Sequence, residues 1–137
     1  MKNGRVPLMI GGAANALFFL FHLWLGWYFH RLPGLPPFVR SVIEMLNGAT
    51  ALFMLFLAIA SLAYATEVLA TRLGLLMLVT ACALFGLRAL AEIFVAPTFS
   101  TPIFVTCLVT SALYFAALPA FREAASVSAP VGRLKGT

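Results

Sequence analysis

The chain has 137 residues, of which 63% are hydrophobic and only 9% are charged. Soluble domains carry about 25% charged residues, so one small core cannot hide this much apolar surface from water. We therefore expect lipid to be the solvent and the chain to form one membrane domain. The net charge of +5 does not indicate nucleic acid as a partner, because no basic stretch is interleaved with aromatic residues and basic residues also flank membrane helices.

Four long apolar segments with short connections predict an all-α integral membrane protein with four helices. Short connections favour antiparallel neighbours, so we expect a four-helix bundle. Trp24, Trp27 and Tyr28 lie near the end of the first segment and are typical of the membrane interface. The predicted spans are residues 8–30, 38–64, 69–95 and 101–118.

Basic residues set the expected orientation. The N-terminus, the connection between the second and third spans and the C-terminal tail together hold six Lys or Arg residues. The other two connections hold only Arg31 and Arg40, so both termini are expected to be cytoplasmic. We expect residues 1–121 to form the transmembrane domain and residues 122–137 to form a flexible basic tail.

Two charged residues lie within the third predicted span. The uncharged run before them, Leu73 to Leu87, holds 15 residues, which cover about 22 Å of a hydrocarbon core that is roughly 30 Å thick. The helix can cross only if it continues past Arg88 and Glu92 to about Val95. Ionisable groups inside a membrane cost about 2.5–3.5 kcal/mol each and usually mark a function.

Polar side chains from all four spans fall at a similar expected depth, about 9–13 Å from the outer helix ends at about 1.5 Å per residue. Each span also carries a stripe of small or polar residues, and such stripes face other helices rather than lipid. We therefore expect one polar cluster in the outer half of the bundle. Its members are His22, Glu44, Asn47, Arg88 and Glu92, with Asn15, Arg40, Thr106 and Tyr114 as secondary members.

Helix spacing and charge predict the pairs within this cluster. Arg88 and Glu92 are four residues apart, as are Arg40 and Glu44, so each pair shares a helix face. Arginine stays charged in any environment, so we expect Arg88 to bond Glu44 across the helices, with Glu92 nearer the outer interface. The expected inward face of the third span is Gly74, Met77, Ala81, Arg88 and Glu92.

Several functions fit such a cluster. It could fix helix register, or it could bind a lipid head group or a quinone at Arg88, with hydrogen bonds from His22 and Asn47. We prefer a non-enzymatic accessory subunit or lipid/quinone-like ligand binder, whose partners are membrane lipid, other membrane subunits or a second copy of the chain. The alternative is a small proton-coupled transporter acting as a dimer, with Glu44 or Glu92 as carrier and His22 as relay.

Enzyme and metal-site motifs are missing from the sequence. No nucleophile lies beside a base and an orienting group at a recognisable spacing, so an enzyme is disfavoured. No His-x-x-His or Glu-x-x-His pair predicts a metal site. The pattern establishes no cofactor, and the ligands that it suggests are a quinone or a bound lipid.

In size, span count and polar positions, residues Leu8 to Phe121 resemble small four-helix bacterial inner-membrane proteins of the DoxX-like kind. The first span differs, since Asn15 and His22 stand where that family usually has an arginine followed by glycines. The resemblance implies a role in redox- or quinone-linked complexes, as an accessory subunit.

Overall fold

The computed structural model describes residues 2–96 and 98–127. In this part of the chain every regular element is a helix and no strand occurs, which confirms the all-α prediction. Four helices are long and apolar enough to cross a membrane, so the chain is a multi-pass membrane protein by length and composition. These spans are Gly4–Arg31, Pro37–Ala63, Arg72–Phe94 and Thr101–Pro119.

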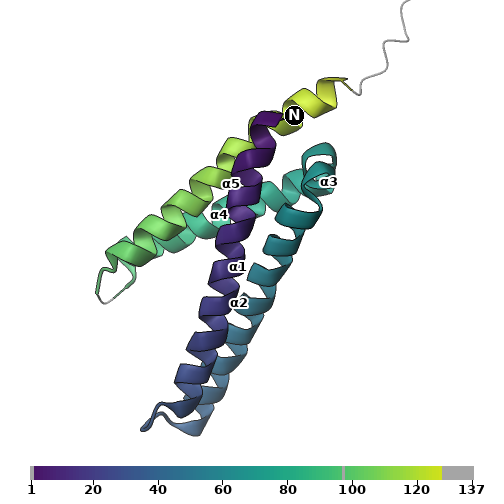
Figure 1. Cartoon of the computed structure of the whole chain (residues 1–137). Helices are drawn as coiled ribbons and strands as arrows, with labels where there is room; N and C mark the ends of the chain where they lie inside the picture. Colours follow the sequence, from purple (N-terminus) through teal and green to yellow (C-terminus); the bar gives the residue numbers. More distant parts are fainter. Residues whose placement is uncertain (1, 97, 128–137) are drawn as a thin grey trace, which may run out of the picture. The chain divides into compact units, whose positions relative to one another are not determined.

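The helices group into two compact units (Figure 1). One unit, Met9–Tyr64, contains α2 and most of α1, and we call it the α1–α2 unit. The other, Met1–Leu8 with Ala65–Thr137, contains α3, α4 and α5, and we call it the α4–α5 unit. The helices are α1 (Lys2–Arg31), α2 (Pro37–Ala63), α3 (Ala65–Ala70), α4 (Arg72–Phe94) and α5 (Thr101–Val127).

In the α1–α2 unit, glycines of α1 let the backbone of α2 come close. A Cβ atom at Gly12 would lie 2.8 Å from the Cβ of Ser61, and one at Gly26 would lie 3.0 Å from Nδ2 of Asn47. Small residues at helix interfaces in membranes allow this approach. In the connection between the two helices Gly34 has φ 83°, a left-handed conformation that glycine adopts without steric cost.

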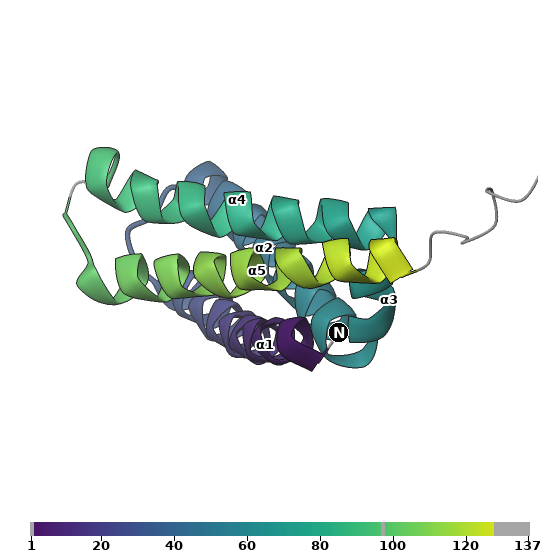
Figure 2. The ribbon, with the colours of Figure 1, turned by 90° about the horizontal axis from the view of Figure 1, so that it is seen from above.

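The α4–α5 unit is built on one buried stripe of each long helix. α4 and α5 lie side by side, and α3 packs against both (Figures 1 and 2). Phe85 of α4 stacks on Tyr114 of α5, with ring centroids 6.3 Å apart and ring planes at 5°. Buried residues recur every three or four positions, as in any helix with one inward face. They are Gly74, Leu78, Ala81, Phe85, Ala89 and Glu92 of α4, and Cys107, Thr110, Tyr114 and Ala117 of α5.

The inward face predicted for α4 was wrong at two positions. Met77 is only partly buried, and the side chain of Arg88 is 47% exposed. Leu78 and Phe85 take inward positions in their place. The stripe that contains these two large apolar residues buries more hydrophobic surface, so it turns inward and moves Arg88 to the edge of the interface.

A short helix and a cap precede α4, and neither was predicted from the sequence. The third span was expected to begin at residue 69, but Leu69 belongs to α3 and α4 begins at Arg72. The hydroxyl of Thr71 accepts a hydrogen bond from the backbone N–H of Gly74 at 3.0 Å. Threonine is a favoured cap because its oxygen satisfies an amide that lacks a partner within the helix.

α5 is longer than the fourth predicted span. It was expected to end near residue 118 and to be followed by a flexible tail from residue 122, but the helix continues past Pro119 to Val127. Proline removes one backbone hydrogen bond, whereas Arg122, Glu123 and Ala124 are residue types that favour helix and support its continuation. Residues 128–137 of the expected tail lie outside the described residues.

The contact between α3 and α4 yields a stability prediction. A Cβ atom at Gly74 would overlap with the backbone carbonyl of Val68, so Gly74→Ala should lower the free energy of unfolding by about 1–3 kcal/mol. Gly48→Ala is the matched control, because no atom lies within 4 Å of its added Cβ, and it should be neutral or stabilising by up to about 1 kcal/mol. Thermal denaturation in detergent measures both, and equal midpoints would contradict the close packing of α3 on α4.

Candidate functional site

In the α1–α2 unit, His22 and Asn47 make a two-point contact. Nδ1 of His22 lies 2.7 Å from Oδ1 of Asn47, and Nδ2 of Asn47 donates to the backbone carbonyl of His22 at 2.8 Å. A carbonyl oxygen can only accept, so the amide nitrogen must face it and the amide oxygen must face the ring. Nδ1 of His22 therefore carries a proton, and Nε2 of the neutral ring is left as an acceptor.

Gly26 makes room for this contact. It follows His22 by about one turn of α1, and a Cβ atom there would lie 3.0 Å from Nδ2 of Asn47. The missing side chain lets Asn47 reach the backbone of α1. His22 and Asn47 were expected at one depth, and Gly26, on the same helix face as His22, is a residue type that predicts close helix packing.

Near the connection between α1 and α2, two predicted cluster members have partners that were not expected. Oε1 of Glu44 lies 3.2 Å from Nδ1 of His30, and the side chains are 36% and 74% exposed. Arg40 donates from Nη2 to the backbone carbonyl of Leu32 at 2.9 Å, so it stabilises the connection rather than pairing with Glu44. Exposed pairs contribute little to stability, so the His30–Glu44 contact marks a polar end of the unit rather than a structural anchor.

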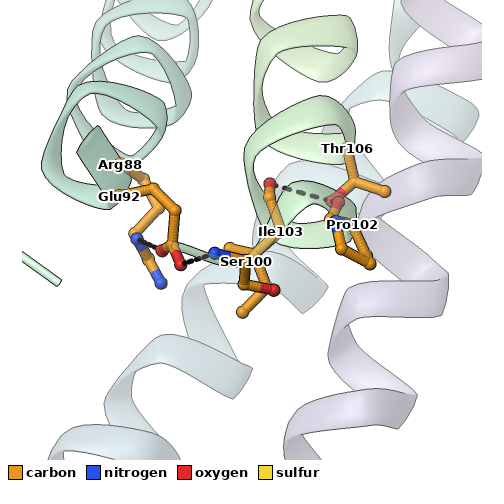
Figure 3. A network of polar contacts seen from close by, with 6 residues as sticks. All are labelled: Arg88, Glu92, Ser100, Pro102, Ile103 and Thr106. Atoms are coloured by element: carbon orange, nitrogen blue, oxygen red, sulfur yellow. Dashed lines mark hydrogen bonds and ion pairs between the residues drawn. The ribbon is translucent and has the colours of Figure 1, made fainter. Parts of the chain in front are cut away.

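In the α4–α5 unit, Glu92 is the buried member of the charged pair. Its side chain is 3% exposed, and its Oε2 accepts from Nη1 of Arg88 at 2.7 Å. Its Oε1 accepts from the backbone N–H of Ser100 at 2.9 Å (Figure 3). Ser100 immediately precedes α5, where the helix dipole favours a negative charge. Glu92 thus joins the end of α4 to the start of α5.

Arg88 keeps donors for a further partner. A guanidinium has five N–H donors, and the one contact that Arg88 makes within the described part of the chain is to Glu92. Nearly half of the side chain is exposed, on a helix that can cross a membrane. Arginine does not lose its charge in hydrocarbon, so these N–H groups need acceptors from outside the α4–α5 unit.

The other secondary members bond to their own helices or pack in the core. The exposed Thr106 donates to the backbone carbonyl of Pro102 at 2.7 Å (Figure 3), and the buried Asn15 donates to that of Gly11 at 2.8 Å. Tyr114 is fully buried in the α4–α5 unit. Side-chain bonds to a preceding carbonyl are common for such residues within helices.

One contact that joins α4 to α5 was not predicted from the sequence. The hydroxyl of Ser111 donates to the backbone carbonyl of Cys82 at 2.8 Å, and Sγ of Cys82 lies 3.5 Å from the same hydroxyl oxygen. A serine on a polar helix face was a signal for an interhelical bond, but its backbone partner has no signature in the sequence.

Two pairs of the predicted cluster are therefore formed, each within one unit. His22 contacts Asn47, and Arg88 contacts Glu92. A bond between Arg88 and Glu44 would link the two units and stays a prediction. Across residues 2–96 and 98–127, no three His, Cys, Asp or Glu side chains lie close enough to hold one metal ion.

The Arg88–Glu92 pair can be tested through a double-variant cycle. Arg88→Leu leaves the buried carboxylate of Glu92 without its cation and should cost about 2–4 kcal/mol of unfolding free energy, given that Arg88 is half exposed. Adding Glu92→Gln should recover at least half of that loss, because the amide oxygen still accepts from Ser100 and no charge is left unpaired. Denaturation of purified proteins in one detergent measures the cycle, and strictly additive losses would mean that the two charges do not interact.

The chain was compared with protein-family models, with curated proteins and with solved structures, and nothing matched in any of the three comparisons. The resemblance to DoxX-like proteins accordingly stays a prediction, and the case for a function depends on the chain's own residues.

Proposed function

We propose that the chain is a small non-enzymatic membrane protein that binds an amphiphile through Arg88. The ligand is a lipid or a quinone-like molecule whose phosphate or carbonyl oxygen accepts from the guanidinium. The observation that supports this proposal most directly is the asymmetry of the charged pair. Glu92 is buried and holds one guanidinium nitrogen at 2.7 Å, while Arg88 is half exposed on a membrane-spanning helix.

The chemistry of the pair suits an oxygen-bearing ligand. Glu92 balances the charge of Arg88 and fixes the direction of its side chain, which lowers the cost of holding a cation in the membrane. The remaining N–H groups lie in a planar fork, the geometry that arginine uses for two parallel bonds to phosphate or carboxylate oxygens. A lone carbonyl oxygen would accept from one of them.

The proposed site has this fork near the membrane surface, and the position of Arg88 along α4 supports that depth. Arg88 precedes Phe94, the last residue of the helix, by six positions, which is about 9 Å at about 1.5 Å per residue. Its side chain bonds Glu92, one turn closer to that end, so the guanidinium lies nearer the head groups than its own Cα does. A phosphate or a shallow carbonyl can therefore reach it from the bilayer.

The same proposal includes the topology of the chain. Consecutive spans are antiparallel neighbours in one bundle of a bacterial inner membrane, with both termini cytoplasmic. The excess of Lys and Arg at the termini and between the second and third spans supports this orientation. The connections at 32–36 and 95–100, and the Arg88 end of α4, would then face the outer side.

The alternative is a proton-coupled transporter that acts as a dimer. The contact between His30 and Glu44 favours it, since a carboxylate and an imidazole 3.2 Å apart can exchange a proton. Two buried polar residues weigh against a longer relay. Asn15 donates to a backbone carbonyl of its own helix, and so does Thr110. We therefore prefer ligand binding, as a subunit that works with other membrane proteins or with a second copy.

Ligand binding at Arg88 is tested by mass spectrometry of lipids and quinones that co-purify from a gentle membrane extract. The wild-type protein should enrich at least one amphiphile, and Arg88→Gln should reduce that enrichment about tenfold, because one charge-assisted contact is lost. Arg72→Gln is the matched control, as it removes the same charge at the opposite end of α4. The proposal fails if nothing is enriched, or if both variants reduce enrichment equally.

The orientation is tested by thiol labelling of intact cells with a reagent that does not cross membranes. Pro33→Cys and Thr98→Cys lie in the two connections expected outside and should react, whereas Gly136→Cys should react only after the membrane is opened. The native Cys82 and Cys107 lie within spans and serve as the unlabelled background. Labelling of residue 136 in intact cells would reverse the proposed topology.

A further inference from the structure

We propose that His22 forms a second site, in the α1–α2 unit, that binds the hydroxyl group of an amphiphile through Nε2 of its ring. The ligand class is a hydrogen-bond donor, such as a quinol or a lipid with a free hydroxyl. This goes beyond the proposed Arg88 site, because a guanidinium only donates and so selects acceptors.

The two-point contact with Asn47 determines which ring nitrogen is available. Asn47 must present its oxygen to Nδ1, because its nitrogen already donates to the backbone carbonyl of His22 at 2.8 Å. The proton of the neutral ring is therefore held at Nδ1, 2.7 Å from that oxygen. A partner that accepts a hydrogen bond from one ring nitrogen fixes the tautomer of the neutral ring, as carbonyl and carboxylate partners do for metal-bound histidines.

Nε2 has no hydrogen-bond partner within the described part of the chain. The contacts of His22 there are the two with Asn47 and an edge contact with the ring of Phe21, whose centroid lies 5.7 Å away. The residue is half-buried. An acceptor of this kind in an apolar environment costs free energy unless a donor reaches it.

The depth of His22 limits what that donor can be. His22 precedes Arg31, the last residue of α1, by nine positions, which is about 13 Å at about 1.5 Å per residue. This lies inside the hydrocarbon region, below the level of bulk water. A donor that reaches Nε2 from the bilayer must therefore belong to a molecule that dissolves there. Quinols and diacylglycerols carry such hydroxyl groups, whereas quinones and triacylglycerols of similar shape carry only acceptors.

Matched probe pairs test this donor selectivity on the purified full chain in nanodiscs. At the His22 site itself, followed through the ring resonances of His22 so that a quinone bound at Arg88 is not counted, a short-chain benzoquinol should bind at least fivefold more tightly than the corresponding benzoquinone, as one additional hydrogen bond implies. Dihexanoylglycerol and trihexanoylglycerol form the second pair. A preference for the hydroxyl member in either pair supports the site and shows whether the ligand is a quinol or a lipid. Equal affinity within both pairs, or no binding of any probe, overturns the proposal.

Nitrogen NMR gives a readout that does not depend on any variant. The chain has two histidines, so labelling with ¹⁵N-histidine reports only His22 and His30. His22 should show the signature of a ring protonated at Nδ1, and the preferred probe should shift its Nε2 resonance. His30, which is largely exposed, is the internal control and should not respond. A bound probe that leaves both nitrogens of His22 unshifted contradicts the proposal.

Variants separate the positioning role of Asn47 from the role of His22 itself. Asn47→Leu keeps the imidazole but removes the group that fixes its tautomer, so the preference for the hydroxyl member should fall below about twofold. His30→Gln and Arg88→Gln should both retain the full preference. If Arg88→Gln keeps the preference for the hydroxyl member, the His22 site is distinct from the proposed Arg88 site, so the two proposals can fail independently. If Asn47→Leu also keeps the full preference, the His22 proposal is overturned.

Discussion

The α4–α5 unit depends on a carboxylate that has been removed from solvent. A buried carboxylate is tolerated only if its oxygens have donors, and both oxygens of Glu92 have one. One donor is the cation of Arg88 and the other is a backbone amide at the start of α5. Burial of one charge therefore fixes the path of the connection after α4, the register of α5 against it and the direction in which Arg88 projects.

The α1–α2 unit uses the same physical principle without a formal charge. Both polar atoms of the Asn47 amide bond to one residue of the opposite helix. The oxygen bonds to the ring of His22, and the nitrogen donates to its backbone carbonyl. In each unit a group that is held by two hydrogen bonds orients a second group that keeps unused hydrogen-bonding capacity. Arg88 retains donors and His22 retains an acceptor, and these are the groups through which we propose that ligands bind.

The apolar segments could be predicted from the sequence because a run of residues long enough to cross the hydrocarbon leaves few alternatives. The contact between His22 and Asn47 could be predicted because both residues fall at a similar depth along their helices. The contact between Arg88 and Glu92 could be predicted because they are four residues apart on one helix. Which member of a charged pair is buried could not be predicted. It depends on how the large residues Leu78 and Phe85 turn α4, and this is decided by packing over the whole stripe.

Local backbone features were also hard to foresee. The short helix α3 ends where Thr71 caps α4, and a single hydroxyl decides that boundary within a stretch whose residues suit one longer helix. The partner of Glu44 could not be predicted either. Glu44 contacts His30 near the end of the neighbouring helix, and the reach of two exposed side chains is not encoded in sequence periodicity.

The bond between Glu92 and Ser100 has a consequence for biosynthesis. The amide that Glu92 requires lies eight residues further along the chain, so it leaves the ribosome later than the carboxylate does. A nascent α4 that partitioned into lipid alone would carry an acid with an unmet oxygen, a costly state in hydrocarbon. The favourable course is for α4 to wait at the translocon until the following segment emerges, and for both to enter the bilayer as a helical pair.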